Sequence, residues 1–576
     1  MNTIRKQIPV FLIPPVLAVL VYAGCFSAGF VYDDYLVIAD NPYIGRSDFI
    51  PKVFTTDYFE WSGEASYRPV VSIVYHLIFQ VFGKSAAAFH AVNIFFHALA
   101  TFLALLLFRR FIPGKWSIWA GAAFAVHPML SEAVCGISFL EDILAGILII
   151  SGFLLFFESR KISGQRGWIY AAGAGLCLFL AGLSKENGFA LLPLGILFIL
   201  IERYRTRGTC RRSYPGLIAM MFAGIFFVFV RFVLMPGITE EAHYPGGNLF
   251  TSLMTTSGIF ASYLGRMIFP LTLSVDRTPT IITSVTNPVF AASALIHIGI
   301  IVSAFLLYRR IPGYSFGVGW FYICLAPAAN IIPIIHPEAD RFLYLPSIGF
   351  FLAAGAALHH FFSSGKRGSR AVFITGIVFL SAWGIRTIDR TPDWKNNARL
   401  WQSEYETQPQ NPRVLTEMAV QSNVSGDYEK AERFAKKALE ISPNLAAPRA
   451  HLARSFLMRG DYEFALPIYR KAADSNELHI HEQSRVLFDM AYIHDEYLKN
   501  GEKAEELYRR SWELNPAMVD AALNLGMIYI GRDSLQKAIK IWSEALRFYP
   551  ENPDLQRNLK IARNSMKKKN EPAKTE

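Results

Sequence analysis

Two adjacent aspartates are candidate catalytic residues because they directly follow an apolar run. Asp33 and Asp34 occur in the sequence Val-Tyr-Asp-Asp-Tyr, where an apolar segment gives way to an acidic loop. Neighbouring carboxylates repel each other, and an apolar environment disfavours their charged form, so both effects raise the pKa of such a pair. A carboxylate with a raised pKa can act as a general base. The alternative interpretation is a polar pair that ends the apolar segment.

Further ionisable residues recur at the ends of apolar segments, and we expect most of them to lie on the same side as the aspartates. These residues are Arg68, His90, His127, Glu132, Asp142, Lys185, Glu186, Asp340 and Arg341. Ionisable side chains at membrane depth are costly and usually functional. Acids combined with Lys185 and Arg341 suggest that an anionic lipid headgroup binds beside a carboxylate base. The His, Asp and Glu residues lack a strong metal-ligand spacing, so we expect no metal site.

The composition indicates which elements must position these residues. The chain has 576 residues, of which 52% are hydrophobic and only 18% are charged, whereas soluble domains average about 25% charged. The apolar excess belongs to residues 1–390, and residues 391–576 have the composition of a soluble helical protein. We therefore predict an all-α chain with a polytopic membrane domain at 1–390 and a soluble domain at 391–576. Collagen-like, disordered and disulfide-stapled classes are excluded.

Eleven apolar segments are candidates for spanning helices, which need about 20 apolar residues. They are 8–29, 88–108, 117–136, 140–157, 168–184, 187–202, 215–235, 288–308, 315–335, 342–362 and 371–388. We interpret two further stretches, 69–83 and 253–270, as interfacial or re-entrant. Lys and Arg gather in alternate loops, which places those loops and the N-terminus in the cytoplasm. The candidate residues and the soluble domain then lie outside the cytoplasm.

Residues 391–576 contain an internal repeat. The sequence Gly-Asp-Tyr-Glu at 426–429 returns at 460–463, an offset of 34, and Ala504 returns as Ala538 at the same offset. This period and these Ala positions are typical of tetratricopeptide repeats. Such repeats form a concave groove that binds peptides or protein helices, although they can also serve only as a scaffold. We predict a half-repeat at 393–410, repeats at about 411–444, 445–480, 483–517 and 518–551, and a basic C-terminal tail.

The cysteines and the net charge suggest no additional chemistry. The five cysteines lie mostly in apolar runs without paired spacing, so we interpret them as small core residues. The net charge of +11 reflects the basic cytoplasmic loops, so we expect no nucleic-acid partner.

Taken together and in order, the motifs resemble those of the transmembrane and tetratricopeptide-repeat O-mannosyltransferases, which belong to the GT-C superfamily of polytopic glycosyltransferases. The motifs are Asp33-Asp34, Tyr67-Arg68-Pro69, His90 with Asn93 and His97, His127-Pro128 with Glu132, Ser184-Lys185-Glu186, and the run from Asp340 to Ser347. The resemblance implies an inverting transfer of mannose, or a related sugar, from a polyprenyl-phosphate carrier to a Ser or Thr hydroxyl of a protein.

The resemblance also implies roles for individual residues. Asp33 or Asp34 would be the base, with Asp33 slightly favoured, and Lys185 and Arg341 would bind the lipid phosphate. The residues that would orient sugar or acceptor are Glu132, Asp142, Glu186, His127, Arg68, His90 and Asp340. The chain departs from the family pattern at two places: Asp-Arg-Phe at 340–342 replaces Glu-Arg-Tyr, and Leu-Glu-Asp at 140–142 replaces Arg-Ala-Asp.

These interpretations define the expected partners and the alternatives. We expect a polyprenyl-phosphate sugar as the donor substrate, an acceptor protein at the repeats, a surrounding bilayer, and no tightly bound cofactor or divalent metal. The expected location is a bacterial inner membrane with periplasmic repeats, or alternatively the endoplasmic reticulum with lumenal repeats. The alternative functions are a GT-C enzyme that modifies an envelope lipid or polysaccharide, and a non-enzymatic membrane scaffold for protein assembly. The scaffold would need none of the acids outside the cytoplasm.

Overall fold

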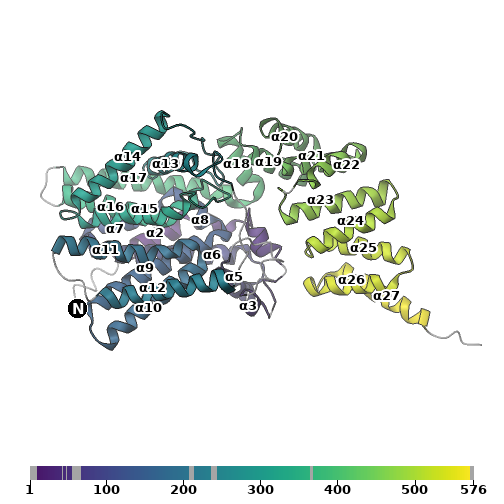
Figure 1. Ribbon diagram of the computed structural model, residues 1–576, viewed down its shortest axis with the longest axis horizontal. Helices are drawn as coiled ribbons and strands as arrows, with labels where there is room; N and C mark the ends of the chain where they lie inside the picture. The colour runs from purple at the N-terminus through teal and green to yellow at the C-terminus, as the bar shows by residue number, and fades with distance from the viewer. Residues whose placement is uncertain are drawn as a thin grey trace, which may run out of the picture. The chain divides into compact units, whose positions relative to one another are not determined.

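The computed structural model describes residues 10–41, 43–46, 48–54, 67–206, 213–234, 243–363, 368–475 and 477–570. All regular elements in these ranges are helical, which confirms the predicted all-α class (Figure 1). Two compact units meet in the sequence at Leu400 and Trp401, within helix α18 (Asn397–Thr407). The second unit also includes the segment Ala39–Lys52. Arg5 and Lys6, which precede the first predicted span, and Cys210 lie outside the described residues.

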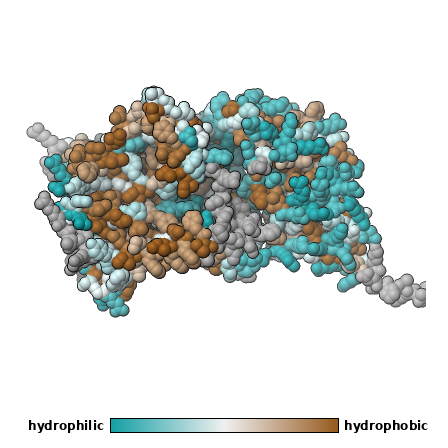
Figure 2. Space-filling view, in the orientation of Figure 1, coloured by the Kyte–Doolittle hydropathy of each residue, from teal (hydrophilic) through white to brown (hydrophobic). Residues whose placement is uncertain are grey.

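The first unit consists of apolar helices separated by short helical turns, and Figure 2 shows hydrophobic residues spread over its surface. Its elements in the first half are α2 (Ile13–Val21), η1 (Ala23–Ser27), η2 (Tyr35–Ala39), α5 (Pro69–Phe82), α6 (Ala86–Phe111), α7 (Lys115–Val126), η3 (Pro128–Leu130), α8 (Ser131–Cys135), η4 (Ile137–Phe139), α9 (Leu140–Lys161), α10 (Gln165–Ser184) and η5 (Glu186–Ala190). The elements that follow are α11 (Leu191–Thr206), α12 (Tyr214–Phe229), η7 (Val230–Leu234), α13 (Leu249–Arg266), α14 (Pro288–Leu307), α15 (Pro312–Leu325), η8 (Ala326–Ala328), η9 (Asp340–Leu343), α16 (Tyr344–Phe362), α17 (Ser369–Arg390) and η10 (Thr391–Lys395).

Several of these helices have the length and composition of membrane spans. Within the described residues, eight helices qualify, and a ninth is added if α7 and the helix Pro128–Cys135, bent by 49°, form one span. Pro128 accounts for the bend because proline cannot donate a backbone hydrogen bond. Two predicted spans, 8–29 and 315–335, correspond to the shorter helices α2 with η1 and α15. The number of eleven crossings therefore stays a prediction.

The two stretches predicted to be interfacial or re-entrant, 69–83 and 253–270, form helices that differ in length. Helix α5 has 14 residues, which is short for a crossing. Helix α13 has 18 residues, begins at the cap residue Asn248, whose side chain accepts a hydrogen bond from the Thr251 N–H, and ends at the buried Arg266. A buried arginine at a helix end needs anionic partners, and these are described below. Whether the two helices lie at the interface is still a prediction.

The second unit is a series of antiparallel helix pairs with hydrophilic surfaces (Figure 2). Its repeated pairs are α19 (Pro412–Val424) with α20 (Tyr428–Ile441), α21 (Ala446–Met458) with α22 (Tyr462–Ala473), α23 (Ile480–Tyr492) and η11 (Ile493–Tyr497) with α24 (Gly501–Leu514), and α25 (Val519–Gly531) with α26 (Leu535–Phe548), followed by α27 (Pro553–Asn570). Gly426 and Gly460 adopt φ values of 81° and 86° at equivalent turns. Glycine favours this left-handed conformation, so their 34-residue spacing reflects a repeated turn.

Small side chains explain why the helices of each pair pack closely. The alanines at the repeated positions are all fully buried: Ala431, Ala465, Ala504 and Ala538. The segment Ala39–Lys52, which contains α3 (Phe49–Lys52), belongs to this unit as well. Its Arg46 donates a hydrogen bond of 3.0 Å to the carbonyl of Arg547, and Tyr43 packs 6.2 Å from the ring of Phe548. The segment Ala39–Lys52 of the acidic loop therefore packs against the last repeat.

Candidate active site

Lys185 forms the centre of a buried group of charges in the first unit. It follows the last residue of α10, and the two acids that contact it occupy the first turn of α9. The Lys185 Nζ lies 2.5 Å from Asp142 Oδ2 and 3.2 Å from Glu141 Oε1. All three side chains are at most 7% exposed. Acids in a first helical turn are also favoured by the helix dipole, which helps α9 to hold two adjacent carboxylates.

Arg68 brings a second cation to the same acids. It directly precedes α5, and its Nη1 lies 2.5 Å from Glu141 Oε2. Its Nη2 lies 3.7 Å from Glu186 Oε2, at the start of η5. Four predicted site residues, Arg68, Asp142, Lys185 and Glu186, are thus brought together by contacts to Glu141 or to one another. Glu141, which is not among the predicted site residues, bridges Arg68 and Lys185.

Arg341 and Glu132 form a second buried pair beside this group. The Arg341 backbone N–H donates to Glu132 Oε2 at 2.7 Å, and its guanidinium donates to the other carboxylate oxygen. The guanidinium carbon also lies 4.5 Å from the centre of the Phe139 ring and 5.3 Å from that of Phe342. The Phe342 ring lies 5.9 Å from Lys185 Nζ as well. The Phe342 ring therefore lies within 6 Å of both Lys185 and Arg341, the two cations that the resemblance assigns to the phosphate.

The two aspartates have different surroundings. Asp34 is fully buried, and its carboxylate accepts hydrogen bonds from the backbone N–H groups of Val31, at 3.0 Å, and Ser138, at 2.7 Å. Burial raises the pKa of Asp34 to about 7, although these hydrogen bonds oppose the shift. Asp33 is partly exposed, and the positive charge of Arg341 acts on it. Asp34 therefore fastens the loop to η4, while Asp33 is the accessible member of the pair.

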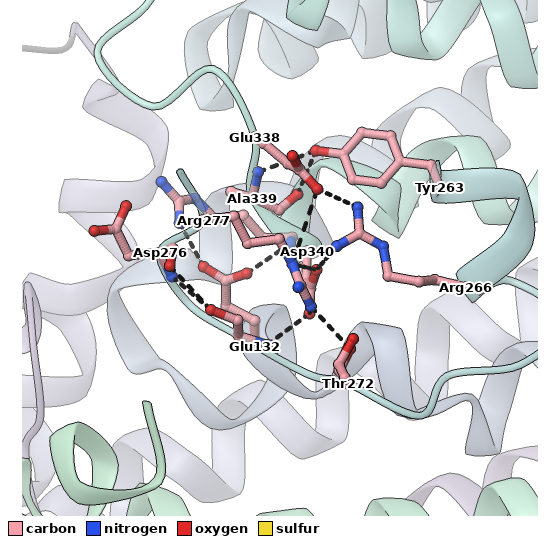
Figure 3. Close-up of polar contacts among 11 residues, drawn as sticks. Glu132, Tyr263, Arg266, Thr272, Asp276, Arg277, Glu338, Ala339 and Asp340 are labelled. Atoms are coloured by element: carbon pink, nitrogen blue, oxygen red, sulfur yellow. Dashed lines mark hydrogen bonds and ion pairs between the residues drawn. The ribbon is translucent and has the colours of Figure 1, made fainter. Parts of the chain in front are cut away.

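Asp340 belongs to a neighbouring cluster that also contains two arginines (Figure 3). Its carboxylate accepts hydrogen bonds from the Ser274 backbone N–H at 2.9 Å and from Arg277 Nε at 3.1 Å. Arg266, at the end of α13, lies 3.6 Å from Asp340 and pairs with Glu338. Figure 3 shows both arginines reaching toward Asp340 and Glu338. Because Asp340 adjoins Arg341, this cluster fixes the turn η9 that carries Arg341.

Arg277 is the arginine of this second cluster that the sequence alone does not indicate. Arg266 lies in the stretch 253–270, for which we predict an interfacial or re-entrant helix. A signal for Arg266 is its basic charge in a stretch that we expect on the side of the membrane where basic residues are scarce. Its partners could not be inferred, because Arg266 and Glu338 are 72 positions apart.

The two predicted histidines bind backbone carbonyls. His90 Nε2 lies 3.2 Å from the carbonyl of Gly29, four residues before Asp33. His127 Nε2 lies 3.1 Å from the carbonyl of Met267, and its Nδ1 accepts a hydrogen bond from the Met129 N–H. A carbonyl accepts only, so each Nε2 carries the proton. His90 thus supports the loop of the aspartates, and His127 joins η3 to the chain after α13.

The arrangement combines hydrogen-bond donors with an accessible carboxylate. An ammonium group has three donors, and Lys185 directs two of them to Asp142 and Glu141. A cation held in this way can neutralise charge on a bound anion without rearranging. Among the residues that the structure describes, no group of three or more His, Cys, Asp or Glu side chains is placed to hold a metal ion.

Comparison with known proteins supports the resemblance that the motifs indicated. A tetratricopeptide-repeat family matches residues 425–445, which confirms the repeats there. A protein O-mannosyl-transferase of Caenorhabditis elegans is 24% identical over 445 residues, covering 74% of this chain and 62% of that protein. Protein O-mannosyl-transferase TMTC3 of Homo sapiens is 22% identical over 613 residues, covering 96% of this chain and 66% of that protein. The chain thus spans slightly less than two thirds of the length of these relatives.

An archaeal enzyme is among the solved structures that cover much of the chain. The oligosaccharyltransferase AglB of Archaeoglobus fulgidus is 14% identical and superimposes with a TM-score of 0.39, covering 74% of this chain and 59% of that chain.

Proposed function

We propose that the chain is an integral-membrane glycosyltransferase of GT-C type that transfers mannose, or a related sugar, from a polyprenyl-phosphate donor to Ser or Thr hydroxyls of proteins. The observation that carries the proposal is the buried network of Arg68, Glu141, Lys185 and Asp142 at helix ends. The partly exposed Asp33 interacts electrostatically with Arg341, the other cation of the site. Buried ion pairs are costly in an apolar domain, so a network of this size points to a bound, charged substrate. Similarity to protein O-mannosyl-transferases supports the reaction class.

Asp33 is the proposed general base. It accepts the proton of the acceptor hydroxyl, whose oxygen attacks the sugar C1 from the face opposite the phosphate, so the configuration at C1 inverts. Asp34 is a positioning residue, because both of its oxygens accept backbone N–H groups that hold the loop. Since Asp34 is fully buried, it is a poorer candidate for contact with the acceptor.

Lys185 and Arg341 are the proposed ligands of the donor phosphate. As the bond between C1 and the phosphate oxygen breaks, negative charge increases on the phosphate, and the two cations stabilise it. Asp142 and Glu132 keep the two cations in place through the contacts described above. The carboxylates already balance both cations, so donor affinity depends on the remaining N–H groups and on burial of the polyprenyl chain.

The other predicted site residues support these groups or contact the substrates. Arg68 contacts Glu186 at the start of η5, and we propose that these two residues orient the sugar. Asp340, His90 and His127 act indirectly, by fixing η9, the aspartate loop and η3. We propose that the repeats bind the acceptor protein and that they lie outside the cytoplasm, as in the periplasm of a bacterium. No tightly bound cofactor is needed for this chemistry.

Mass spectrometry of envelope proteins from cells with and without this chain tests the proposal. We expect Ser- or Thr-linked hexose on a set of proteins only when the chain is present. Hexose that depends on the chain but occurs in lipid or polysaccharide would support the alternative GT-C activity. If the glycans of the protein, lipid and polysaccharide fractions are identical in cells with and without the chain, both enzymatic functions are contradicted and the scaffold is favoured.

A further inference from the structure

Two cysteines far apart in the sequence meet inside the first unit. Cys25 lies in η1, and Cys135 is the last residue of α8. The residues are 110 positions apart, yet their sulfur atoms lie 2.9 Å from each other. Both side chains are fully buried.

The separation is short for two unbonded thiols. Non-bonded carbon atoms settle at about 3.5–4.0 Å, and sulfur is larger than carbon. The backbone has already brought the two side chains into contact, so a bond between them requires only a small further movement. We propose that Cys25 and Cys135 form a disulfide bond in the mature protein.

The location gives the bond a specific consequence. Cys25 lies on the segment that leads to Asp33, and Cys135 lies three residues after Glu132 and three before Ser138. The disulfide would tie the segment of the aspartates to the corner between α8 and α9. This corner already receives the hydrogen bond from Ser138 to Asp34 and holds the partner of Arg341. The bond would therefore fix the position of the proposed base, Asp33, relative to the proposed phosphate ligand, Arg341.

The chemistry requires an oxidising compartment, so the inference depends on the proposed location of this site outside the cytoplasm. The two thiols release two protons and two electrons. The electrons pass to an oxidised disulfide of a thiol–disulfide oxidoreductase: one cysteine thiolate attacks it, and the second then displaces the carrier as a thiolate. Because both sulfurs are buried in the folded chain, this exchange takes place before folding is complete.

Differential alkylation of the full-length chain tests the bond. The chain is purified from membranes in detergent, denatured with an alkylating reagent in the absence of reductant, and analysed by intact mass and peptide mapping. Of the five cysteines, we expect three to be alkylated, with Cys25 and Cys135 in one linked peptide, and five after reduction. Alkylation of all five without reduction, or a linkage between other cysteines, would overturn the proposal.

Single variants give a second, independent result. In Cys25→Ala all remaining cysteines are expected to react without reduction, because Cys135 loses its partner. The matched control is Cys324→Ala, which removes another buried thiol, in α15, and is expected to retain the linked peptide. Protection of Cys135 in Cys25→Ala after denaturation would contradict the pairing. The readout is mass alone, so a chain without transferase activity still tests this inference, and failure of the bond leaves the proposed reaction open.

Discussion

Each of the two units contains a close pair of a lysine and a carboxylate, but one pair is buried and the other is exposed. Lys185 and Asp142 in the first unit lie 2.5 Å apart with side chains 6% and 1% exposed. Lys503 and Glu506 in the repeats lie 2.6 Å apart with side chains 43% and 48% exposed. Distance therefore does not distinguish the two pairs, whereas burial does. An exposed pair of this kind contributes at most about 1 kcal/mol, but breaking a buried pair leaves an unpaired charge in an apolar environment.

Removing the cation from the buried pair is expected to have the largest effect on stability. Lys185→Met leaves Asp142 and Glu141 adjacent and buried with less compensation, so we expect destabilisation of about 3–5 kcal/mol. Thermal unfolding in detergent, followed by intrinsic fluorescence, measures the loss. An unfolding temperature equal to that of the unmodified chain would show that the network does not depend on Lys185.

Asp34 in the first unit and Asp48 in the second unit differ in the sign of their pH dependence. Burial raises the pKa of Asp34 from 3.8 to about 7, so the folded state binds more protons than the unfolded state between these values. Stability from Asp34 is therefore present below about pH 4 and is lost as pH rises to about 7, with a slope of at most about 1.4 kcal/mol per pH unit. Unfolding temperatures across this range measure the total slope, and Asp34→Asn should reduce it by the share that Asp34 contributes. An unchanged slope in that variant would contradict the assignment.

Asp48 in the second unit shows the opposite behaviour. Its hydrogen bond with Arg46 lowers the pKa of Asp48 to about 2. Its contribution is present above the ordinary value of 3.8 and is lost as pH falls toward 2. Asp48→Asn should therefore leave the slope between pH 4 and pH 7 unchanged, which makes it the matched control for Asp34→Asn.

Packing at the corner between α8 and α9 provides a smaller effect. A Cβ atom on Gly136 would lie 2.5 Å from the Phe139 ring and 3.0 Å from the carbonyl of Glu132. Gly136→Ala therefore forces the ring to move, with an expected loss of about 1–3 kcal/mol. Gly531→Ala in the repeats is the control, because nothing lies within 4 Å of its added atom. Equal unfolding temperatures for the two variants would contradict the tight packing of this corner.

The exposed pair is expected to show the smallest effect. Lys503→Met removes a contact of the i, i+3 type, which contributes about 0.2–0.5 kcal/mol. We expect its unfolding temperature to remain near that of the unmodified chain and to depend weakly on salt. A loss comparable to that of Lys185→Met would remove the distinction between the two units.

The comparison also explains what the sequence could predict. The repeats follow local rules: the 34-residue offset, the buried alanines and the glycine turns are visible in the sequence and agree with the structure. The apolar segments likewise predicted a helical first unit. Contacts in the site are not local, since Lys185 and Asp142 are 43 positions apart and Arg341 and Glu132 are 209 apart. The residue types were therefore predictable, but their partners, including the bridging role of Glu141, were not.

The separate surroundings of the two adjacent aspartates were also beyond sequence reasoning. Whether Asp33 or Asp34 is buried depends on the backbone of Ser138, which lies 104 positions away from Asp34. The same limit applies to the number of membrane crossings. A segment can be apolar over 20 residues and still form a shorter helix: the helix at the predicted span 315–335 is α15, which has 14 residues and ends at Leu325.

The most direct test of the central claim is sugar transfer by Asp33→Asn. Membranes that contain the variant are incubated with labelled polyprenyl-phosphate mannose, and label in the protein fraction is measured. The control is Asp48→Asn, in the same acidic loop but paired with Arg46 in the second unit. We expect Asp33→Asn to lose transfer by about 100-fold or more at unchanged expression, and Asp48→Asn to retain it. Transfer by Asp33→Asn at the rate of the unmodified chain would contradict the account.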